Sequence, residues 1–373
     1  HWSFTPYAMY GVPTIAFALC YYNRGGHYSL SAPLQLAGGK LFSGKGAAVI
    51  DSLALFALTA GVAASLGAGM MTLADGAARG LNLDDGPLLR LIVATVIVAV
   101  FTVSSVSGLQ RGIKILSDLN IRIFFILAIF IFVAGPTLEI VKSASAGLVE
   151  YGATFLSRSV VHPLTADNQW QRDWTMFYYA NWAAWAPITA LFLGRISLGY
   201  TVREAILFNI IAPALFGILW MSIFGGAALE LDVQSSQSLT QTLADRGPEA
   251  IVFSLLGLLP LASLMAPLFL FAMFISFVTA MDSNTHSIAS VCLRANRQSD
   301  EVKGAGLWIK VFWGVAIGAV SWIMTSTNGI DGVKMLSNLG GAPGLVILLG
   351  CIVAIVRLIL LGPKQLEQVK TAS

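Results

Sequence analysis

Long apolar stretches separated by short polar links follow one another along the whole chain. A helix that spans a membrane needs about 20 mainly apolar residues, and about nine stretches reach that length. They are residues 5–23, 47–73, 88–108, 114–136, 171–197, 203–228, 258–292, 306–326 and 340–361. This pattern predicts an all-α polytopic membrane protein with about nine transmembrane helices.

The composition supports this prediction. Of the 373 residues, 56% are hydrophobic and 11% are charged, whereas soluble domains carry about 25% charged residues. The three cysteines lie at unrelated spacings, so neither a disulfide framework nor a metal-binding motif is expected. The sequence carries none of the motifs of phosphate-binding loops, serine hydrolases or zinc proteases. These observations argue against an enzyme, and no basic segment suits a nucleic acid.

The basic residues of the polar links predict the orientation. If the first apolar stretch runs towards the cytoplasm, most Lys and Arg residues fall on the cytoplasmic side and most acidic residues on the other side. We therefore expect a multi-pass protein of the inner (plasma) membrane whose C-terminus lies in the cytoplasm. Residues 140–166 combine apolar residues with Ser, Gly and few charges, and such a segment can lie flat as an interfacial helix.

A stripe of aromatic residues occupies the middle of the chain. Trp174, Phe177, Tyr178, Trp182 and Trp185 follow spacings that place their rings on one side of a helix. A column of π faces in a low-dielectric setting suits a cation without N–H donors, such as a quaternary ammonium or sulfonium group. The alternative interpretation is that the rings only fill a core or form a belt at the membrane interface.

A second aromatic group lies in the first apolar stretch and contains Trp2, Tyr7 and Tyr10. Tyr7 and Tyr10 are three residues apart and share a helix face, and Pro6 is tolerated in a first helical turn. Together with Trp182, these rings are candidates for a box around an onium head group. An interfacial belt is the alternative, and it fits Trp2 and Tyr7 better than Tyr10.

A third candidate region is residues 277–283, which read FVTAMDS inside an apolar stretch. Thr279 offers a hydroxyl that can join backbone carbonyls around a small hard cation such as sodium, and Asp282 is an acid in or near the membrane, where such residues are functional candidates. The alternatives are a bond from Thr279 to the carbonyl four residues earlier and a helix-end carboxylate paired with a neighbour. Asp118 and Arg122, four residues apart, are expected to form an ion pair within one helix.

These motifs together resemble those of one known family. Residues 173–187 and 192–204 read DWTMFYYANWAAWAP and FLGRISLGYTVRE, and they closely resemble the signature of the betaine/carnitine/choline transporter family. The opening HWSFTPYAMY is similar to that family's H-W-x-x-x-P-W-A-x-Y, and residues 277–283 are similar to its F-x-T-S-A-D-S. The resemblance covers essentially the whole chain.

The resemblance implies a single transmembrane transporter domain, residues 1–373, with a LeuT-type core of two inverted repeats. Residues 1–139 would be the remainder of the first repeat, 140–166 an interfacial helix or linker, 167–361 the second repeat and 362–373 a short cytoplasmic tail. The family plan also has two leading helices and a first core helix, which we expect to be missing from this chain. Family members often form trimers, so a homotrimer in the lipid bilayer is expected.

The resemblance also implies roles for individual residues. It places the substrate box at Trp2, Tyr7, Tyr10 and Trp182, with Phe177 and Trp185 along the route. Tyr7 stands where the family usually has Trp. Asn181 also replaces a Trp, and its amide can donate and accept hydrogen bonds, which suits a substrate with a hydroxyl or carboxylate.

For sodium, the resemblance matches Phe277 and Thr279 to ligand positions, whereas Ala280 replaces the usual Ser. Leu58 and Val62 align with the threonines of a second sodium site and cannot bind the ion. The implied function is a secondary active transporter of quaternary ammonium or sulfonium compounds such as betaine, choline or carnitine, with sodium as coupling ion and no other cofactor. The alternatives are a sodium-independent precursor/product antiporter and an osmosensor that binds onium compounds without transporting them.

Overall fold

A computed structural model of the protein describes residues 1–25, 29–107, 110–159, 169–293 and 303–371, and every regular element in these ranges is a helix. The α-helices are α1 (Phe4–Ala18), α2 (Ser31–Gly38), α3 (Lys45–Leu81), α4 (Pro87–Ser107), α5 (Gln110–Ala134), α6 (Thr137–Ser159), α7 (Gln169–Ile196), α8 (Val202–Ile206), α9 (Ala212–Gln234), α10 (Ser238–Arg246), α11 (Ile251–Gly257), α12 (Ala262–Cys292) and α13 (Lys303–Thr371). Short π-helical turns, η1 (Leu19–Asn23) and η3 (Leu207–Ile211), continue α1 and α8, and 3₁₀ turns η2 (Gly39–Phe42) and η4 (Pro248–Ala250) precede α3 and α11.

Six helices within the described ranges are long and apolar enough to cross a membrane, so the prediction of an all-α polytopic membrane protein is confirmed. The difference from the expected nine has local causes. Helix α1 has only 15 residues before its π-helical turn, and the Trp, Tyr and Asn residues of α7 lower its mean hydropathy. The last two predicted stretches, 306–326 and 340–361, both fall within α13.

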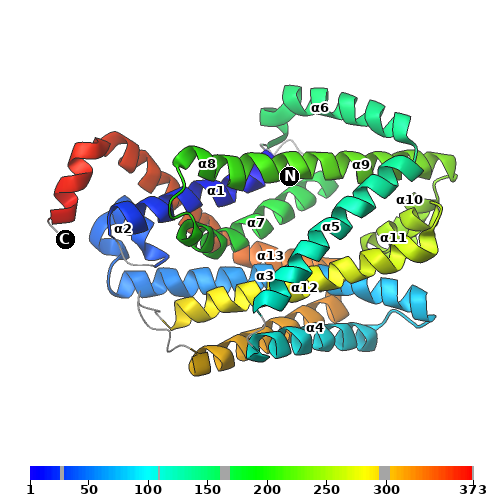
Figure 1. The fold of residues 1–373 in the computed structure, drawn as a ribbon, viewed down its shortest axis with the longest axis horizontal. Coiled ribbons are helices and arrows are strands. Elements are labelled where there is room, and N and C mark those ends of the chain that lie inside the picture. The colour runs from blue at the N-terminus through cyan, green and yellow to red at the C-terminus, as the bar shows by residue number, and fades with distance from the viewer. Residues whose placement is uncertain (26–28, 108–109, 160–168, 294–302, 372–373) are drawn as a thin grey trace.

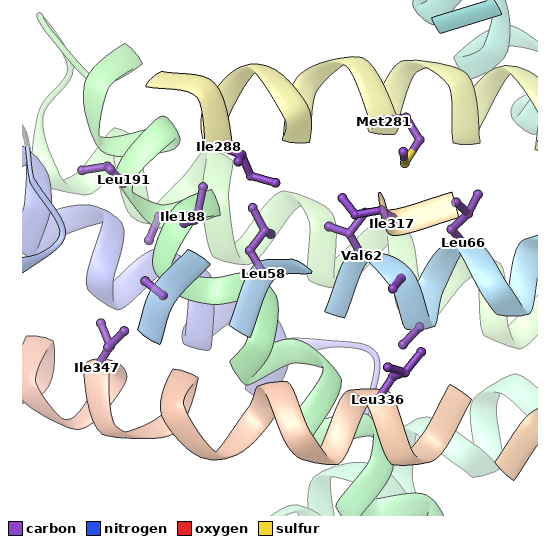
Figure 2. Close-up of a cluster of buried hydrophobic side chains, with 14 of the residues drawn as sticks. Leu58, Val62, Leu66, Ile188, Leu191, Met281, Ile288, Ile317, Leu336 and Ile347 are labelled. Carbon is purple, nitrogen blue, oxygen red and sulfur yellow. The ribbon is translucent and has the colours of Figure 1, made fainter. Parts of the chain in front are cut away.

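Helix α13 turns sharply near its middle. Gly329 has a φ of 53°, which an L residue with a side chain rarely adopts. A Cβ atom added to Gly332 would lie 2.4 Å from the carbonyl oxygen of Met324, whereas eight residues of straight helix span about 12 Å. Figure 2 accordingly shows Ile317 and Leu336 on separate stretches of ribbon. The two stretches are therefore two arms joined at this turn.

Helix α3 lies at the centre of the bundle and packs against α13, α7, α12 and α4 (Figure 1). Its buried side chains Leu58 and Val62 belong to a hydrophobic cluster with Ile188 of α7 and Ile288 of α12 (Figure 2). The many Gly and Ala residues of α3 let neighbouring helices approach closely, as is typical of helices packed in membranes.

The contact between α7 and α13 is built of small residues on both sides. Gly340, Gly341 and Gly344 of α13 face Ala180, Ala183 and Ala184 of α7. A Cβ atom added to Gly344 would lie 2.1 Å from the carbonyl oxygen of Ala183, so no side chain fits there. The two backbones therefore lie in direct contact, which fixes the position of the aromatic helix α7.

The segment predicted to be interfacial, 140–166, begins within α6. This helix crosses the outer side of the bundle and packs against α9, where Ile140 contacts Gly226 (Figure 1). Residues 160–166 lie outside the described ranges. The placement of this segment in the membrane interface and the division into repeats and a tail stay predictions.

Candidate functional site

The two predicted aromatic groups meet in the structure. The Trp182 ring on α7 is surrounded by three rings from the beginning of the chain: its centroid lies 5.2 Å from that of Trp2, 5.4 Å from that of Tyr7 and 4.8 Å from that of Tyr10. The planes of these rings are inclined to that of Trp182 by 57° to 71°. Tilted and edge-to-face arrangements of this kind are the favoured geometry of aromatic pairs.

Close helix contacts hold the α1 rings in place. A Cβ atom added to Gly217 of α9 would lie 2.7 Å from the Trp2 carbonyl oxygen, and one added to Gly11 would overlap the side chain of Ile210 in η3. The absence of side chains at these two glycines therefore lets α1 lie directly on α9 and η3. The Trp2 ring also stands edge-on to Tyr178, at 5.1 Å between centroids.

A cavity of about 440 Å³ adjoins this aromatic cluster. Each of the four helices α1, α3, α7 and α12 contributes to its lining. The lining residues are Trp2, Tyr7, Tyr10, Ser65, Asn181, Trp182, Trp185, Ile188, Thr189, Phe192, Ala280, Ser283, Asn284 and Ser287. We call this space the aromatic cavity. None of these described lining residues is charged, so a bound ion would be met by rings, hydroxyls and amides.

Six of the seven predicted substrate residues line the aromatic cavity, and Phe177 is the exception among the described residues. Its side chain is 8% exposed and packs against Trp174 and Tyr178 in the hydrophobic core. The role of Phe177 along a substrate route stays a prediction, while its position is that of a core residue.

Three polar side chains of α7 that line the cavity, Asn181, Trp182 and Trp185, differ in their hydrogen bonding. Asn181 accepts a hydrogen bond through its Oδ1 from the hydroxyl of Ser337 on α13, at 3.2 Å. The indole N–H groups of Trp182 and Trp185 are buried and find no acceptor in the part of the chain that the structure describes. A buried donor without a partner destabilises the fold by roughly 1–3 kcal/mol. The two indole N–H groups are therefore unsatisfied donors beside the cavity.

The predicted sodium residues lie on α12. The Phe277 ring packs on Gly69 of α3, where a Cβ atom would lie 1.8 Å from its ring. The Thr279 hydroxyl donates to the carbonyl oxygens of Ile275 and Ser276 in its own helix, at 2.9 and 3.1 Å. Asp282 forms an ion pair with Lys310 at 4.0 Å. Thus the alternative geometries, a bond within the helix for Thr279 and a neighbouring partner for Asp282, are the ones observed.

A second cavity of about 510 Å³ lies between α12 and α5. We call it the polar cavity. Its lining residues are Lys114, Ser117, Asp118, Asn120, Ser276, Thr279, Ala280 and Ser283. Ala280 and Ser283 line both cavities, so the two cavities are neighbours along one face of α12.

The amide of Asn120 is a notable feature of the polar cavity. Its nitrogen donates to the Ser276 hydroxyl at 2.7 Å, whereas its oxygen is buried and receives no hydrogen bond from the described residues. The prediction of an ion pair between Asp118 and Arg122 was wrong. Both side chains are described in the structure, and they do not form an ion pair with each other. Asp118 instead lines the cavity, while Arg122 is exposed.

Sequence reasoning missed several polar residues in or beside the two cavities, namely Ser65, Asn120 and Asn284 in their linings and Ser337 behind Asn181. Each interrupts an otherwise apolar helix, which was the available signal. Hydroxyls and amides in membrane helices usually bond within their own helix or to a neighbouring one, as Asn284 does with the carbonyl of Ala280 at 2.7 Å. Their sequence positions alone therefore do not distinguish them from structural residues.

The sequence is similar to one family of known proteins. The family model described as "BCCT, betaine/carnitine/choline family transporter" matches residues 1–360. An "Ectoine/hydroxyectoine transporter" of Virgibacillus pantothenticus is 28% identical over 99% of this chain and 72% of its own length. A "Probable glycine betaine transporter" of Desulfitobacterium hafniense is 30% identical over 91% of this chain and 66% of its own length. A "High-affinity choline transport protein" of Escherichia coli is 28% identical over 92% of this chain and 50% of its own length. The chain thus spans 50% to 72% of the length of these relatives.

Proposed function

The chain belongs to the betaine/carnitine/choline family of transporters, and on that premise we propose that it is part of a secondary active transporter of quaternary ammonium or sulfonium compounds. The resemblance inferred from its motifs is thereby confirmed. The family and the relatives are transporters and not enzymes.

One observation carries this proposal: the rings of Trp2, Tyr7 and Tyr10 each lie within 5.4 Å of the Trp182 ring, centroid to centroid, beside the aromatic cavity. An onium group has no N–H donors, so it forms no conventional hydrogen bonds to acceptors in a binding site. The faces of Trp and Tyr rings attract such a cation by about 2 kcal/mol per contact when the site is dry. A cavity of this size, uncharged and walled by rings, therefore suits a small onium compound.

The arrangement of helices supports alternating access. The walls of the aromatic cavity come from α1 and α3 in the first half of the chain and from α7 and α12 in the second half. Substrate sites between the repeats of LeuT-type transporters are exposed alternately when one group of helices rocks against the other. We propose that this chain follows the same plan, with two inverted repeats.

Sodium is the proposed coupling ion, with Phe277 and Thr279 at its site. The Thr279 hydroxyl donates its proton within its helix, and the lone pairs of its oxygen are the groups that would bind the ion. Sodium-independent exchange is the second candidate, and it is favoured by Ala280, which offers no hydroxyl, and by the complete burial of Leu58. An osmosensor that binds but does not transport is a third outcome of the test below.

The membrane setting is proposed from the sequence and the surface. We place the protein in the inner (plasma) membrane with its C-terminus in the cytoplasm. Helix α6 exposes apolar side chains, including Val149 at 75% and Leu156 at 78% of their maximum area. This exposed apolar surface supports the proposed contact of α6 with the lipid interface or with neighbouring subunits of a homotrimer.

The proposal is tested by uptake into proteoliposomes that contain the purified protein. Labelled glycine betaine, choline, carnitine and ectoine are offered with an inward sodium gradient, without sodium, and with unlabelled substrate inside. Sodium-driven uptake of one of them is the expected result. Uptake only against internal substrate would establish exchange, and binding without uptake would establish sensing. Neither binding nor uptake of any of the four compounds would overturn the proposed function.

A further inference from the structure

Asn181 has an unusual position in the aromatic cavity. It lies on α7 directly before Trp182, and it shares one face of the helix with Trp185 and Ile188, four and seven residues further on. All four of these residues line the cavity. A substrate whose cationic group rests against the Trp182 ring therefore has the Asn181 side chain within reach of its other end.

The orientation of the Asn181 amide is set from outside the cavity. Its Oδ1 accepts the hydrogen bond from Ser337, whose side chain is fully buried in α13. The direct backbone contact between Gly341 and Ala180 keeps the two helices at this separation. Because the oxygen of the amide is engaged by Ser337, the nitrogen, which carries two donors, is the end left for the cavity.

The polar groups on the opposite wall are already engaged. On α12, the Ser283 hydroxyl donates to the carbonyl of Thr279, the Asn284 amide to that of Ala280, and the Ser287 hydroxyl to that of Ser283. The two hydroxyl donors and one of the two N–H donors of Asn284 are thus bonded to their own helix. The lining also contains no Lys or Arg that would pair with an anionic group.

We propose that Asn181 determines which onium compounds the site prefers: its amide nitrogen donates a hydrogen bond to a carboxylate that the substrate carries next to its cationic group. Ser337 is the positioning residue that holds the amide in this orientation. The preferred ligand is thus a zwitterion, whose cation rests on the rings and whose carboxylate is bound by a neutral donor. This inference rests on the proposed function and names the substrate class of the same cavity.

The binding of two probes to the purified protein, measured by calorimetry, tests this inference. Glycine betaine carries a trimethylammonium group and a carboxylate, whereas tetramethylammonium carries a similar cation and no acceptor. We expect the protein to bind glycine betaine more tightly. A hydrogen bond to a charged group contributes about 10-fold or more in affinity, so Asn181→Leu should lower the ratio of the two affinities by about 10-fold. Ser337→Ala should lower the same ratio by a smaller factor, because the amide is kept but is no longer held.

Trp182→Ala is the matched control, since the loss of a ring that binds the cation weakens both probes and leaves their ratio intact. The double variant Asn181→Leu/Ser337→Ala removes the hydroxyl that the single variant leaves buried without an acceptor, and it should show the same loss of ratio. If the wild-type protein binds both probes and the Asn181 variants lose both to the same extent, Asn181 is structural and the inference is overturned. If the wild-type protein binds neither probe, the inference is overturned, whereas the proposed function is overturned only if choline, carnitine and ectoine are not bound either.

Discussion

The aromatic cavity and the polar cavity adjoin the same face of helix α12 and share Ala280 and Ser283, yet their remaining linings differ in kind. Among the described residues, the aromatic cavity is lined by five Trp and Tyr rings and by no charged side chain. The polar cavity is lined by the ammonium group of Lys114, the carboxylate of Asp118 and the hydroxyl of Thr279. The first lining suits a large cation with diffuse charge, and the second offers the oxygen ligands that a small cation requires.

The difference shows how one helix can serve two kinds of ligand. Residues three and four apart lie on the same face of a helix, so Ala280, Ser283 and Asn284 face the rings. Ser276 and Thr279, each four residues before one of the shared residues, continue the same face towards the part of α12 that borders α5. A small movement of α12 would therefore alter both cavities at once, which is the physical basis that coupled transport needs.

The largest effect is expected from a substitution in the contact between α7 and α13, which holds the aromatic helix α7 in place. In Gly344→Ala, the new methyl group would overlap the Ala183 carbonyl oxygen, so α7 must move away from α13. Overpacking of this kind costs about 1–3 kcal/mol, and we expect the unfolding temperature to fall by about 5 °C. Onium binding should be lost together with the position of Trp182. Differential scanning fluorimetry and calorimetry measure the two effects.

Gly225→Ala is the matched control, because a Cβ atom added to Gly225 in α9 meets no atom within 4 Å. Alanine stabilises the interior of a helix by about 1 kcal/mol relative to glycine, so this variant should be at least as stable as the wild type. Equal stability of the two variants would contradict the direct contact of α7 with α13.

The next largest effect is expected when the Trp182 ring, which contacts three other rings of the aromatic cavity, is removed. Trp182→Ala should weaken the binding of choline by about 10- to 100-fold, since a desolvated cation–π wall is lost. Titration calorimetry with the purified protein measures this change. Trp220→Ala is the control, because Trp220 stacks on Phe224 at 4.1 Å in a separate aromatic group. An equal loss of affinity in both variants would mean that the effect comes from general destabilisation.

A smaller effect is expected on the polar side. Thr279→Ala should raise the sodium concentration for half-maximal uptake by about 3- to 10-fold, because one oxygen ligand is lost. The measurement is uptake into proteoliposomes as a function of sodium. Thr95→Ala removes a hydroxyl with the same kind of bond within its helix, to the carbonyl of Leu91 at 2.7 Å, and should leave the sodium dependence as it is. A normal sodium dependence of the Thr279 variant would remove Thr279 from the proposed site.

The smallest effect is expected from a substitution in the part of α12 that lines both cavities. Ala280→Ser adds a hydroxyl at a position that lines both cavities. We expect it to lower the half-maximal sodium concentration by about 2- to 5-fold if the hydroxyl joins the ion. The same uptake assay measures it. A change in onium affinity without any change in sodium dependence would place residue 280 functionally in the aromatic cavity alone.

Much of the aromatic site was predictable from the sequence, because its residues recur with the period of a helix. The spacing of Trp182 and Trp185 on α7 and of Tyr7 and Tyr10 on α1 placed these rings on common faces, and the structure brings the two helices together. Phe177 has the same spacing but turns into the core. Periodicity gives the face of a helix, and it does not say which neighbouring helix covers each part of that face.

The hydrogen bonds and ion pairs of the polar residues were predicted less well, since they depend on contacts between distant segments. The bond from Ser337 to Asn181 joins residues 156 positions apart, and the buried Asn120 meets Ser276 across the same separation. The Asp118–Arg122 pair failed although its spacing was favourable, because exposed pairs of this kind gain only a few tenths of a kcal/mol. The sharp turn of α13 at Gly329 falls in the link between the predicted stretches 306–326 and 340–361, so this break was predicted from the apolar pattern.

The central claim is that the aromatic cavity binds its ligand through positive charge held against ring faces. The most direct test compares, by titration calorimetry, the binding of choline with that of its neutral isostere, in which carbon replaces the quaternary nitrogen. The account predicts that choline binds the wild-type protein about 10-fold or more tightly than the isostere, and that Trp182→Leu removes most of this difference. Equal binding of the two compounds by the wild-type protein, or an unchanged difference in the variant, would contradict it.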